Sequence, residues 1–242
     1  QRESEVLHDL MDARTRGEEQ KRPSVETLLH NLFDKRYVVH LHPALVNGLC
    51  CSKGGEAEAL RLFGDKIVWI PLIKPGYILA VAVAEAMREY KGQHGRDADI
   101  VLLQNHGVFV AGDSEEEIDR AYSYIFDTLE RSLISTPKRS AAEFDKERAA
   151  LLAPAVRMLL REGKTSVVTF RTDSQILGFL RDEKAFFPLR SAYTPDHIVY
   201  CRPYPLYVGA AESIDEQYSL LQDGIERYKK ENGYAPRVVA VE

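Results

Sequence analysis

Short runs rich in β-branched and aromatic residues alternate along this chain with longer segments of helical periodicity. Residues 37–42 and 67–70 are two such runs, and each meets a proline at its end. Residues 77–90 are apolar on nearly every side, which predicts a buried helix. Residues 100–103 and 108–110 are predicted strands separated by Gln-Asn-His-Gly, which forms either a hairpin or a sharp bend. Strands that alternate with helices predict the α/β fold class.

Two capping boxes mark the starts of further helices. Ser114 is followed three positions later by Glu117, and Ser213 by Glu216. In this arrangement each side chain satisfies a backbone N–H at the helix start. The second helix is predicted to end at Gly233, because glycine adopts the left-handed conformation that often terminates a helix.

A domain boundary is predicted near residues 135–140, which are small, basic and interrupted by a proline. We predict a core domain over 1–136 and a C-terminal α/β extension over 137–242, either separate or packed on the same sheet. The extension is predicted to begin with a helix over 142–161 that Pro154 kinks or splits. Its other predicted elements are a short helix at 173–180 and strands at 166–170, at 185–189, from 197 and from 235.

The composition excludes several classes of protein. The chain has 242 residues, with 32 Lys+Arg against 37 Asp+Glu and a formal net charge of −5. This balance does not suit a protein whose main partner is a nucleic acid or an anionic membrane. No apolar run reaches the roughly 18 residues of a membrane-spanning helix, and no secretory signal pattern occurs. Because Cys50 and Cys51 are adjacent and only one other cysteine exists, we expect a reducing, cytoplasmic location.

The pair His40 and His42 is the first candidate for chemistry. Residues two apart on a strand point to the same face, so both imidazoles are predicted to project from one side of the sheet. Two neutral imidazoles held close together suit zinc or a similar divalent ion. The alternative is that one histidine bonds within the core and the other faces a cleft.

His106 is the candidate third ligand, since it ends an apolar strand next to Gly107, where a backbone can approach a ligand closely. The alternative is an ordinary turn histidine. Three histidine ligands would leave a fourth position open for substrate or water. The remaining histidines, His8, His30, His94 and His197, are weaker candidates.

Glu26 is the candidate general acid/base. It is predicted in the first turn of a helix capped by Ser24, where the helix dipole favours an ionised carboxylate. The alternative is that Glu26 only complements this dipole.

Three separated motifs resemble the class II aldolase and adducin family. Pro-Ser-Val-Glu at 23–26, Val-Val-His-Leu-His-Pro at 38–43 and Leu-Leu-Gln-Asn-His-Gly-Val at 102–108 follow the family's order of acid, His-x-His and Asn/Gln-His-Gly. The resemblance covers about residues 20–135. The second half is similar to the aldolase part of bifunctional rhamnulose-1-phosphate aldolase/lactaldehyde dehydrogenase proteins. The Gly-x-Gly-x-x-Gly run of a dinucleotide-binding dehydrogenase does not occur in the sequence.

The resemblance implies a three-layer α/β/α sandwich of the class II aldolase type, followed by the extension. It implies that His40, His42 and His106 bind Zn²⁺ or another divalent metal, that Glu26 is the catalytic acid/base, and that Ser24 lies beside the substrate. The implied reaction is zinc-dependent cleavage of a ketose 1-phosphate, such as rhamnulose 1-phosphate, to dihydroxyacetone phosphate and an aldehyde. The implied partners are a small-molecule sugar phosphate and further copies of the chain, often four.

Several alternatives stay open beside the aldolase. An epimerase, a decarboxylase or a dehydratase of the same family would use the same site, although its epimerases tend to have Asp where this chain has Glu26. A non-catalytic adducin-like interaction module is the alternative from another class. The family's Gly-Asn-x-Ser phosphate loop does not occur in residues 1–22, which leaves the phosphorylation of the substrate open. Because the chain opens on Gln1 and closes in a predicted strand, we expect a fragment of a longer polypeptide.

Overall fold

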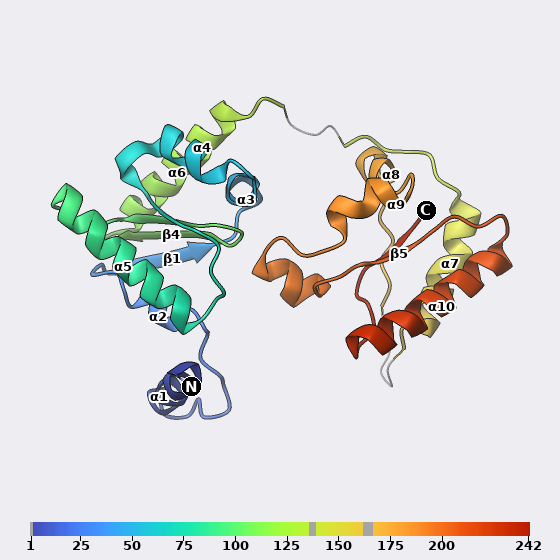
Figure 1. The fold of residues 1–242 in the computed structure, drawn as a ribbon, viewed down its shortest axis with the longest axis horizontal. Coiled ribbons are helices and arrows are strands. Elements are labelled where there is room, and N and C mark those ends of the chain that lie inside the picture. Colours follow the sequence, from blue (N-terminus) through green and yellow to red (C-terminus); the bar gives the residue numbers. More distant parts are fainter. Residues whose placement is uncertain (1, 136–138, 162–166) are drawn as a thin grey trace. The chain divides into compact units, whose positions relative to one another are not determined.

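The structure is a computed structural model that describes residues 2–135, 139–161 and 167–242 (Figure 1). The chain divides into two compact units, Gln1–Leu133 and Ile134–Glu242. The predicted linker at 135–140 begins at this division, and its positions 136–138 lie outside the described residues.

The first unit is built on a four-stranded sheet with the strand order β1-β4-β3-β2. Strand β4 pairs antiparallel with both β1 and β3, and β3 pairs parallel with β2. The elements of this unit are α1 (Arg2–Asp12), α2 (Thr27–His30), β1 (Tyr37–Leu41), α3 (Ala44–Cys50), α4 (Gly55–Phe63), the 3₁₀ turn η1 (Gly64–Lys66), β2 (Val68–Ile70), α5 (Tyr77–His94), β3 (Ile100–Leu103), β4 (Gly107–Gly112) and α6 (Glu115–Ser132).

Both faces of this sheet are buried, because successive side chains of a strand point to opposite sides. Val108 and Val110 pack with residues of α3, α4 and α6. Phe109 and Ala111 pack with residues of α2 and α5 on the other face. Figure 1 shows these helices as layers on either side of the sheet. The unit is therefore an α/β sandwich of three layers, and the predicted fold class is confirmed.

The β3–β4 turn and the helix start at Ser114 form as predicted, while Oε2 of Glu117 accepts a hydrogen bond from the N–H of Asp113, one residue before the expected donor. The turn contains Asn105 at φ 56°, a left-handed conformation that Asn tolerates better than most residues. The Oγ atom of Ser114 accepts a hydrogen bond from the backbone N–H of Glu117 at 3.3 Å and starts α6. The turn places His106 at one end of the sheet, and α6 starts at the other end of β4.

The second unit contains a two-stranded parallel sheet, β5-β6, packed on helices. Helix α10 connects the two strands and ends at Gly233 with φ 76°, as the sequence predicted. Pro154 lies inside α7, which continues through it. The elements of this unit are α7 (Lys146–Leu159), α8 (Ser174–Phe179), α9 (Glu183–Phe186), the 3₁₀ turn η2 (Phe187–Leu189), the π-helical turn η3 (His197–Cys201), β5 (Leu206–Val208), α10 (Ile214–Asn232) and β6 (Val239–Val241).

Three strands predicted in this unit are wrong. Residues 185–189 are helical, because the Asp182 carboxylate accepts a hydrogen bond from the N–H of Ala185 at 2.7 Å and starts a helix, while Pro188 has no N–H for a sheet. Residues 197–201 form a π-helical turn. Residues 167–170 are described and belong to no strand, and residue 166 lies outside the described range.

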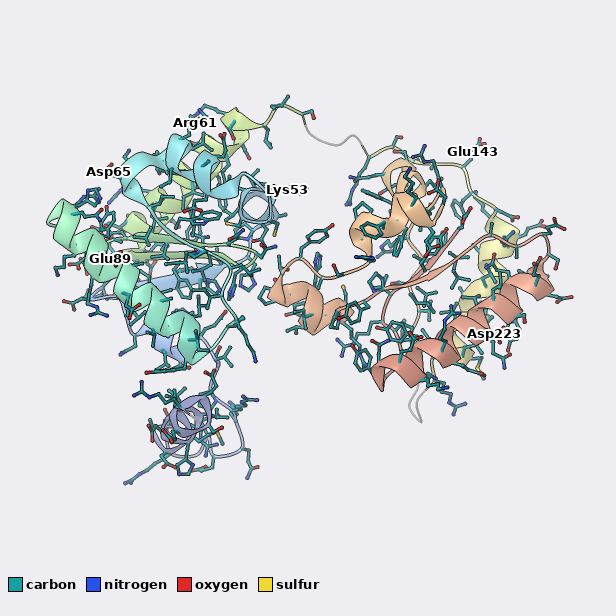
Figure 2. The ribbon with its side chains drawn as sticks, in the orientation of Figure 1. Lys53, Arg61, Asp65, Glu89, Glu143 and Asp223 are labelled. Carbon is teal, nitrogen blue, oxygen red and sulfur yellow. The ribbon has the colours of Figure 1, made fainter. Side chains whose placement is uncertain are left out.

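Helix α5 is less buried than its composition predicts. Ile78 is 61% exposed and Val81 37%, whereas Leu79 and Val83 are buried in the core. The sheet therefore covers one side of this helix only. The exposed charged residues Arg61 and Glu89 lie on the helices that flank the sheet (Figure 2). Among the helices formed by the described residues, we find none with the length and apolar content needed to cross a membrane.

Candidate metal centre

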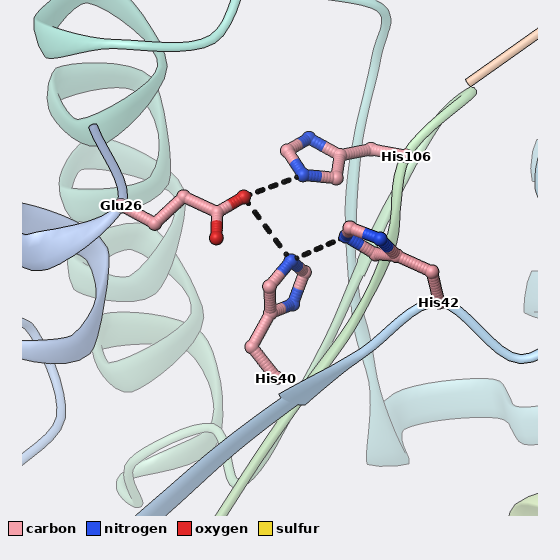
Figure 3. Close-up of side chains that lie close together, drawn as sticks. All are labelled: Glu26, His40, His42 and His106. Carbon is pink, nitrogen blue, oxygen red and sulfur yellow. Dashed lines mark hydrogen bonds and ion pairs between the residues drawn. The ribbon is translucent and has the colours of Figure 1, made fainter. Parts of the chain in front are cut away.

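Four side chains from three separate parts of the first unit converge at one end of its sheet (Figure 3). His40 lies on β1, His42 follows the end of β1, His106 lies in the β3–β4 turn, and Glu26 directly precedes α2. Each offers one ligand atom, and these four atoms all lie within 4.8 Å of one another. The structure thus brings together the three predicted ligands and the predicted acid/base.

The contacts inside this cluster are short. Nε2 of His42 lies 2.8 Å from Nε2 of His40. Oε1 of Glu26 lies 2.8 Å from Nε2 of His106 and 3.3 Å from Nε2 of His40. Ligand atoms about 2.0–2.1 Å from a tetrahedral zinc ion are about 3.3 Å apart. Three imidazole nitrogens and a carboxylate oxygen that all lie within 4.8 Å of one another are therefore suited to hold a divalent metal.

A hydrogen bond to the backbone orients the ring of His40. Its Nδ1 lies 3.0 Å from the carbonyl oxygen of Val108, and because a carbonyl only accepts, Nδ1 is the donor in this hydrogen bond. The Nε2 atom faces the cluster, where it donates to the Glu26 carboxylate when it carries a proton and offers a lone pair to a metal when the ring proton is on Nδ1 alone. The hydrogen bond from Nδ1 to Val108 is of the kind that fixes both the tautomer and the orientation of a metal-binding histidine.

The electrostatics of the cluster keep Glu26 ionised. Hydrogen bonds from His106, and then from His40, hold the pKa of the Glu26 carboxyl well below its usual value, against the opposing effect of burial. The Glu26 side chain remains 23% exposed, whereas that of His106 is only 4% exposed. The carboxylate is therefore more open to solvent and to an incoming molecule than the imidazoles of His40 and His106.

The segment that carries Glu26 differs in detail from the prediction. Helix α2 begins at Thr27, so Glu26 lies just before its first turn. The Oγ atom of Ser24 accepts a hydrogen bond from the N–H of Glu26 at 3.1 Å, and the carbonyl of Ser24 accepts one from the N–H of Thr27. Ser24 is exposed and is not among the four clustered residues. Its predicted place beside a substrate stays a prediction.

The four weaker histidine candidates lie outside the cluster. His8 pairs with Asp12 on α1, and His94 lies in the last turn of α5. His30 is exposed on α2, with its ring 5.2 Å from that of Phe109. His197 belongs to the second unit, where its Nδ1 accepts a hydrogen bond from the N–H of Tyr193.

Sequence reasoning missed Phe109, and although it singled out Gly107 beside His106, it did not predict how closely Gly107 approaches the other two histidines. The ring of Phe109 stacks on His40, with centroids 3.9 Å apart and planes 12° apart. A Cβ atom on Gly107 would lie 2.5 Å from Cδ2 of His42. Both contacts follow from the β1–β4 register, in which His40 is opposite Phe109. Without this register, Phe109 is only one more apolar residue of a strand.

Two family comparisons cover most of the chain. Residues 2–132 match the class II aldolase and adducin N-terminal domain. The chain belongs to the class II aldolase and adducin family. Residues 147–235 match the second domain of class II aldolases, so the predicted resemblance to the class II aldolase family is confirmed for both parts of the chain. The similarity of the second half to the bifunctional rhamnulose-1-phosphate proteins stays a prediction. Class II aldolases use a divalent metal, and the cluster at Glu26, His40, His42 and His106 is suited to hold one.

Two individual proteins have moderate sequence identity to this chain of the class II aldolase and adducin family. It is 28% identical over 227 residues to a Bacillus subtilis (strain 168) protein named "Uncharacterized oxidoreductase YuxG", which covers 87% of this chain and 32% of that protein. The chain thus spans about a third of the length of this curated relative. A solved structure of the N-terminal class II aldolase domain of a conserved protein from Thermoplasma acidophilum is 25% identical, with a TM-score of 0.44, over 53% of this chain and 56% of that chain.

Proposed function

We propose that this chain is a zinc-dependent aldehyde-lyase that cleaves a ketose 1-phosphate, such as rhamnulose 1-phosphate, to dihydroxyacetone phosphate and an aldehyde. The observation that carries the proposal is the position of the Glu26 carboxylate, 2.8 Å from Nε2 of His106 and 3.3 Å from Nε2 of His40. This arrangement combines three nitrogen donors for a metal with an ionised carboxylate that is able to move a proton. Retro-aldol chemistry needs both.

The three imidazoles would hold the ion through their Nε2 atoms, and Glu26 would be either a fourth ligand or the proton carrier. Zinc is our choice because it favours a tetrahedral set of histidine nitrogens and carboxylate oxygens. When bound, such an ion acts as a Lewis acid that polarises the ketose carbonyl and stabilises the negative charge left by bond cleavage. Most of the required stabilisation is electrostatic.

The chain's own part in the reaction is the movement of a proton by Glu26. Cleavage breaks the bond between C3 and C4 of the ketose, whose electron pair passes to C3 and the neighbouring carbonyl. The C4 hydroxyl loses a proton and becomes the aldehyde, and C3 gains a proton to give dihydroxyacetone phosphate, so protons balance. We assign the delivery of the proton to C3, and its removal in the synthetic direction, to Glu26. Its partial exposure leaves it accessible to a substrate.

Other reactions of the family would use the same four residues. A sugar-phosphate epimerase, decarboxylase or dehydratase also needs metal-stabilised enolate chemistry. The word oxidoreductase in the name of the Bacillus subtilis relative describes a protein about three times as long, and it does not specify what the region shared with this chain does. A non-catalytic adducin-like module would need no metal ligands, so the retained cluster favours an enzyme.

We also propose a small-molecule sugar phosphate as the substrate, a homo-oligomer such as a tetramer as the assembly, and the cytoplasm as the location. The proposed assembly comes from the family, in which the site lies at a subunit interface.

The decisive experiment is a cleavage screen with purified protein reconstituted with Zn²⁺. Rhamnulose 1-phosphate, fuculose 1-phosphate and related ketose phosphates are supplied, and dihydroxyacetone phosphate is detected by its enzymatic reduction. Zinc near one equivalent per chain, together with release of dihydroxyacetone phosphate and an aldehyde, supports the proposal. Bound zinc with epimerised, decarboxylated or dehydrated product selects one of the alternatives. Absence of metal binding rejects the enzyme and favours the interaction module.

A further inference from the structure

Gly107 lies where β4, which follows His106, passes the end of β1, which positions His40 and His42. It is the first residue of β4 and follows His106 directly. In the β1–β4 register, the neighbouring pair is Leu41 opposite Val108, so Gly107 lies across from the end of β1, where His42 begins. Gly107 is therefore adjacent to all three imidazoles.

A side chain at this position would have no room. An added Cβ atom would lie 2.5 Å from Cδ2 of His42, 2.5 Å from the carbonyl oxygen of Leu41 and 3.3 Å from Cε1 of His40. Carbon atoms in close-packed interiors lie about 3.5–4.0 Å apart. The His42 ring is able to turn, but the Leu41 oxygen belongs to the backbone, so relief of that contact requires β1 and β4 to separate at this end.

The absence of a side chain at Gly107 is a matter of space and not of backbone conformation. The φ angle of Gly107 is not in the positive region, whereas Gly76 and Gly95 have φ values of 123° and 67°. Alanine therefore suits the backbone at 107 and would act only through its methyl group. This makes a Gly107→Ala substitution a direct probe of the distance between the two strands.

The distance between the two strands also determines how far apart the ligand nitrogens lie. His40 and His42 move with β1, while His106 moves with the β3–β4 turn, which runs directly into β4. We propose that Gly107 is a positioning residue that sets the spacing of His40 and His42 relative to His106, and hence the affinity of the centre for a divalent metal. The inference rests on the metal centre proposed above.

The test compares the Zn²⁺ affinity of the wild-type chain with that of Gly107→Ala, by calorimetry or by competition with a chromophoric chelator. We expect a loss of about 10–100-fold, the range seen when the residues that orient metal ligands are changed. Gly48→Ala is the matched control, because a Cβ at Gly48 on α3 has no atom within 4 Å. Gly112→Ala, at the far end of β4, tests whether a methyl elsewhere on the strand has the same effect.

A second measurement reads the histidines without any metal. Imidazole ¹⁵N spectra of the metal-free protein report whether the His40 ring keeps its proton on Nδ1, as its bond to Val108 requires. The inference expects changed imidazole signals in Gly107→Ala and unchanged signals in Gly48→Ala. A lowered affinity with an unchanged imidazole spectrum would place the effect elsewhere and overturn the inference.

The outcomes separate this inference from the proposed function. A wild-type chain that binds no metal rejects both, whereas equal affinities of wild type and Gly107→Ala reject the inference alone. Should Gly107→Ala not fold, it is combined with His42→Ala, which removes one of the two shortest contacts. The inference then expects a folded double variant with weaker zinc binding than His42→Ala. Equal binding, or failure of the double variant to fold, would overturn it.

Discussion

The imidazole of His40 stacks on the phenyl ring of Phe109, its direct partner across the β1–β4 ladder. The centroids are 3.9 Å apart and the planes 12° apart. Phe109 is 1% exposed and packs among residues of α2 and α5. The hydrophobic core of the first unit thus extends directly under one of the candidate metal ligands, and core packing and ligand orientation are coupled at this pair.

Phe109→Leu is expected to lower both the metal affinity and the stability of the first unit. Leucine keeps an apolar side chain but removes the flat surface on which His40 rests, so we expect about tenfold weaker Zn²⁺ binding and a loss of about 1–2 kcal/mol in the free energy of unfolding. Calorimetric titration and urea denaturation measure the two effects. Zinc affinity equal to that of the wild type would contradict a role for the stack.

Glu26→Gln is expected to retain zinc and to lose most turnover. The three imidazoles remain and the amide has the size of the carboxylate, but an amide does not take up or release a proton near neutral pH. Removal of a general acid/base typically costs about 10²–10⁴-fold in rate. Metal content and kcat are measured on the same preparation, with Gly48→Ala as the control. Near-normal cleavage by Glu26→Gln would show that Glu26 is not the general acid/base.

The stability of the metal-free protein is expected to fall in acid because of Glu26. Hydrogen bonds from His106 and His40 lower the pKa of this carboxyl in the folded state. A lowered pKa stabilises the fold at pH values above the unfolded value of about 4.3, and this contribution is lost as the pH falls toward the folded pKa. Urea denaturation between pH 3 and 7 should therefore show a shallower acid decline for Glu26→Gln. Parallel profiles for the two proteins would exclude this contribution.

Chelation is expected to destabilise the wild-type chain but not His106→Ala. A ligand present at about 1,000 times its dissociation constant adds about 4 kcal/mol to the free energy of unfolding, and loss of one imidazole removes most of this effect. Thermal unfolding with Zn²⁺ and with a chelator measures it. His8→Ala is the matched control, since His8 is exposed on α1, where it pairs with Asp12, and lies outside the cluster. Equal zinc-dependent shifts in His106→Ala and wild type would show that the ion binds elsewhere.

Ser114→Ala is expected to cost about 1 kcal/mol in the free energy of unfolding, because it removes the N-cap of α6. The Oγ atom accepts a hydrogen bond from the N–H of Glu117 at the start of a helix whose buried side packs on the sheet. Ser114→Thr keeps an acceptor and should restore most of the loss. Urea denaturation is the measurement, and equal stability of the alanine and wild-type proteins would argue against the cap.

The second unit shows where local patterns are misleading. Residues 185–189 carry β-favouring side chains, yet Asp182 caps a helix over them. Strand propensity depends on an available partner strand, and such a partner cannot be identified from the segment itself. The capping box at Ser213 was predictable because its donor and acceptor are three residues apart.

The sequence by itself determined the α/β class, the helix starts at Ser114 and Ser213, and the identity of the four residues that converge. Periodicity, caps and short motifs are local properties, and they can be read along the chain. Only the tertiary structure decided that Glu26 reaches two imidazoles and that Phe109 supports His40. It also decided that β1 and β4 approach so closely at Gly107 that a Cβ atom has no space there. These contacts join residues as many as 80 positions apart, and they depend on strand register and packing, which no local pattern specifies.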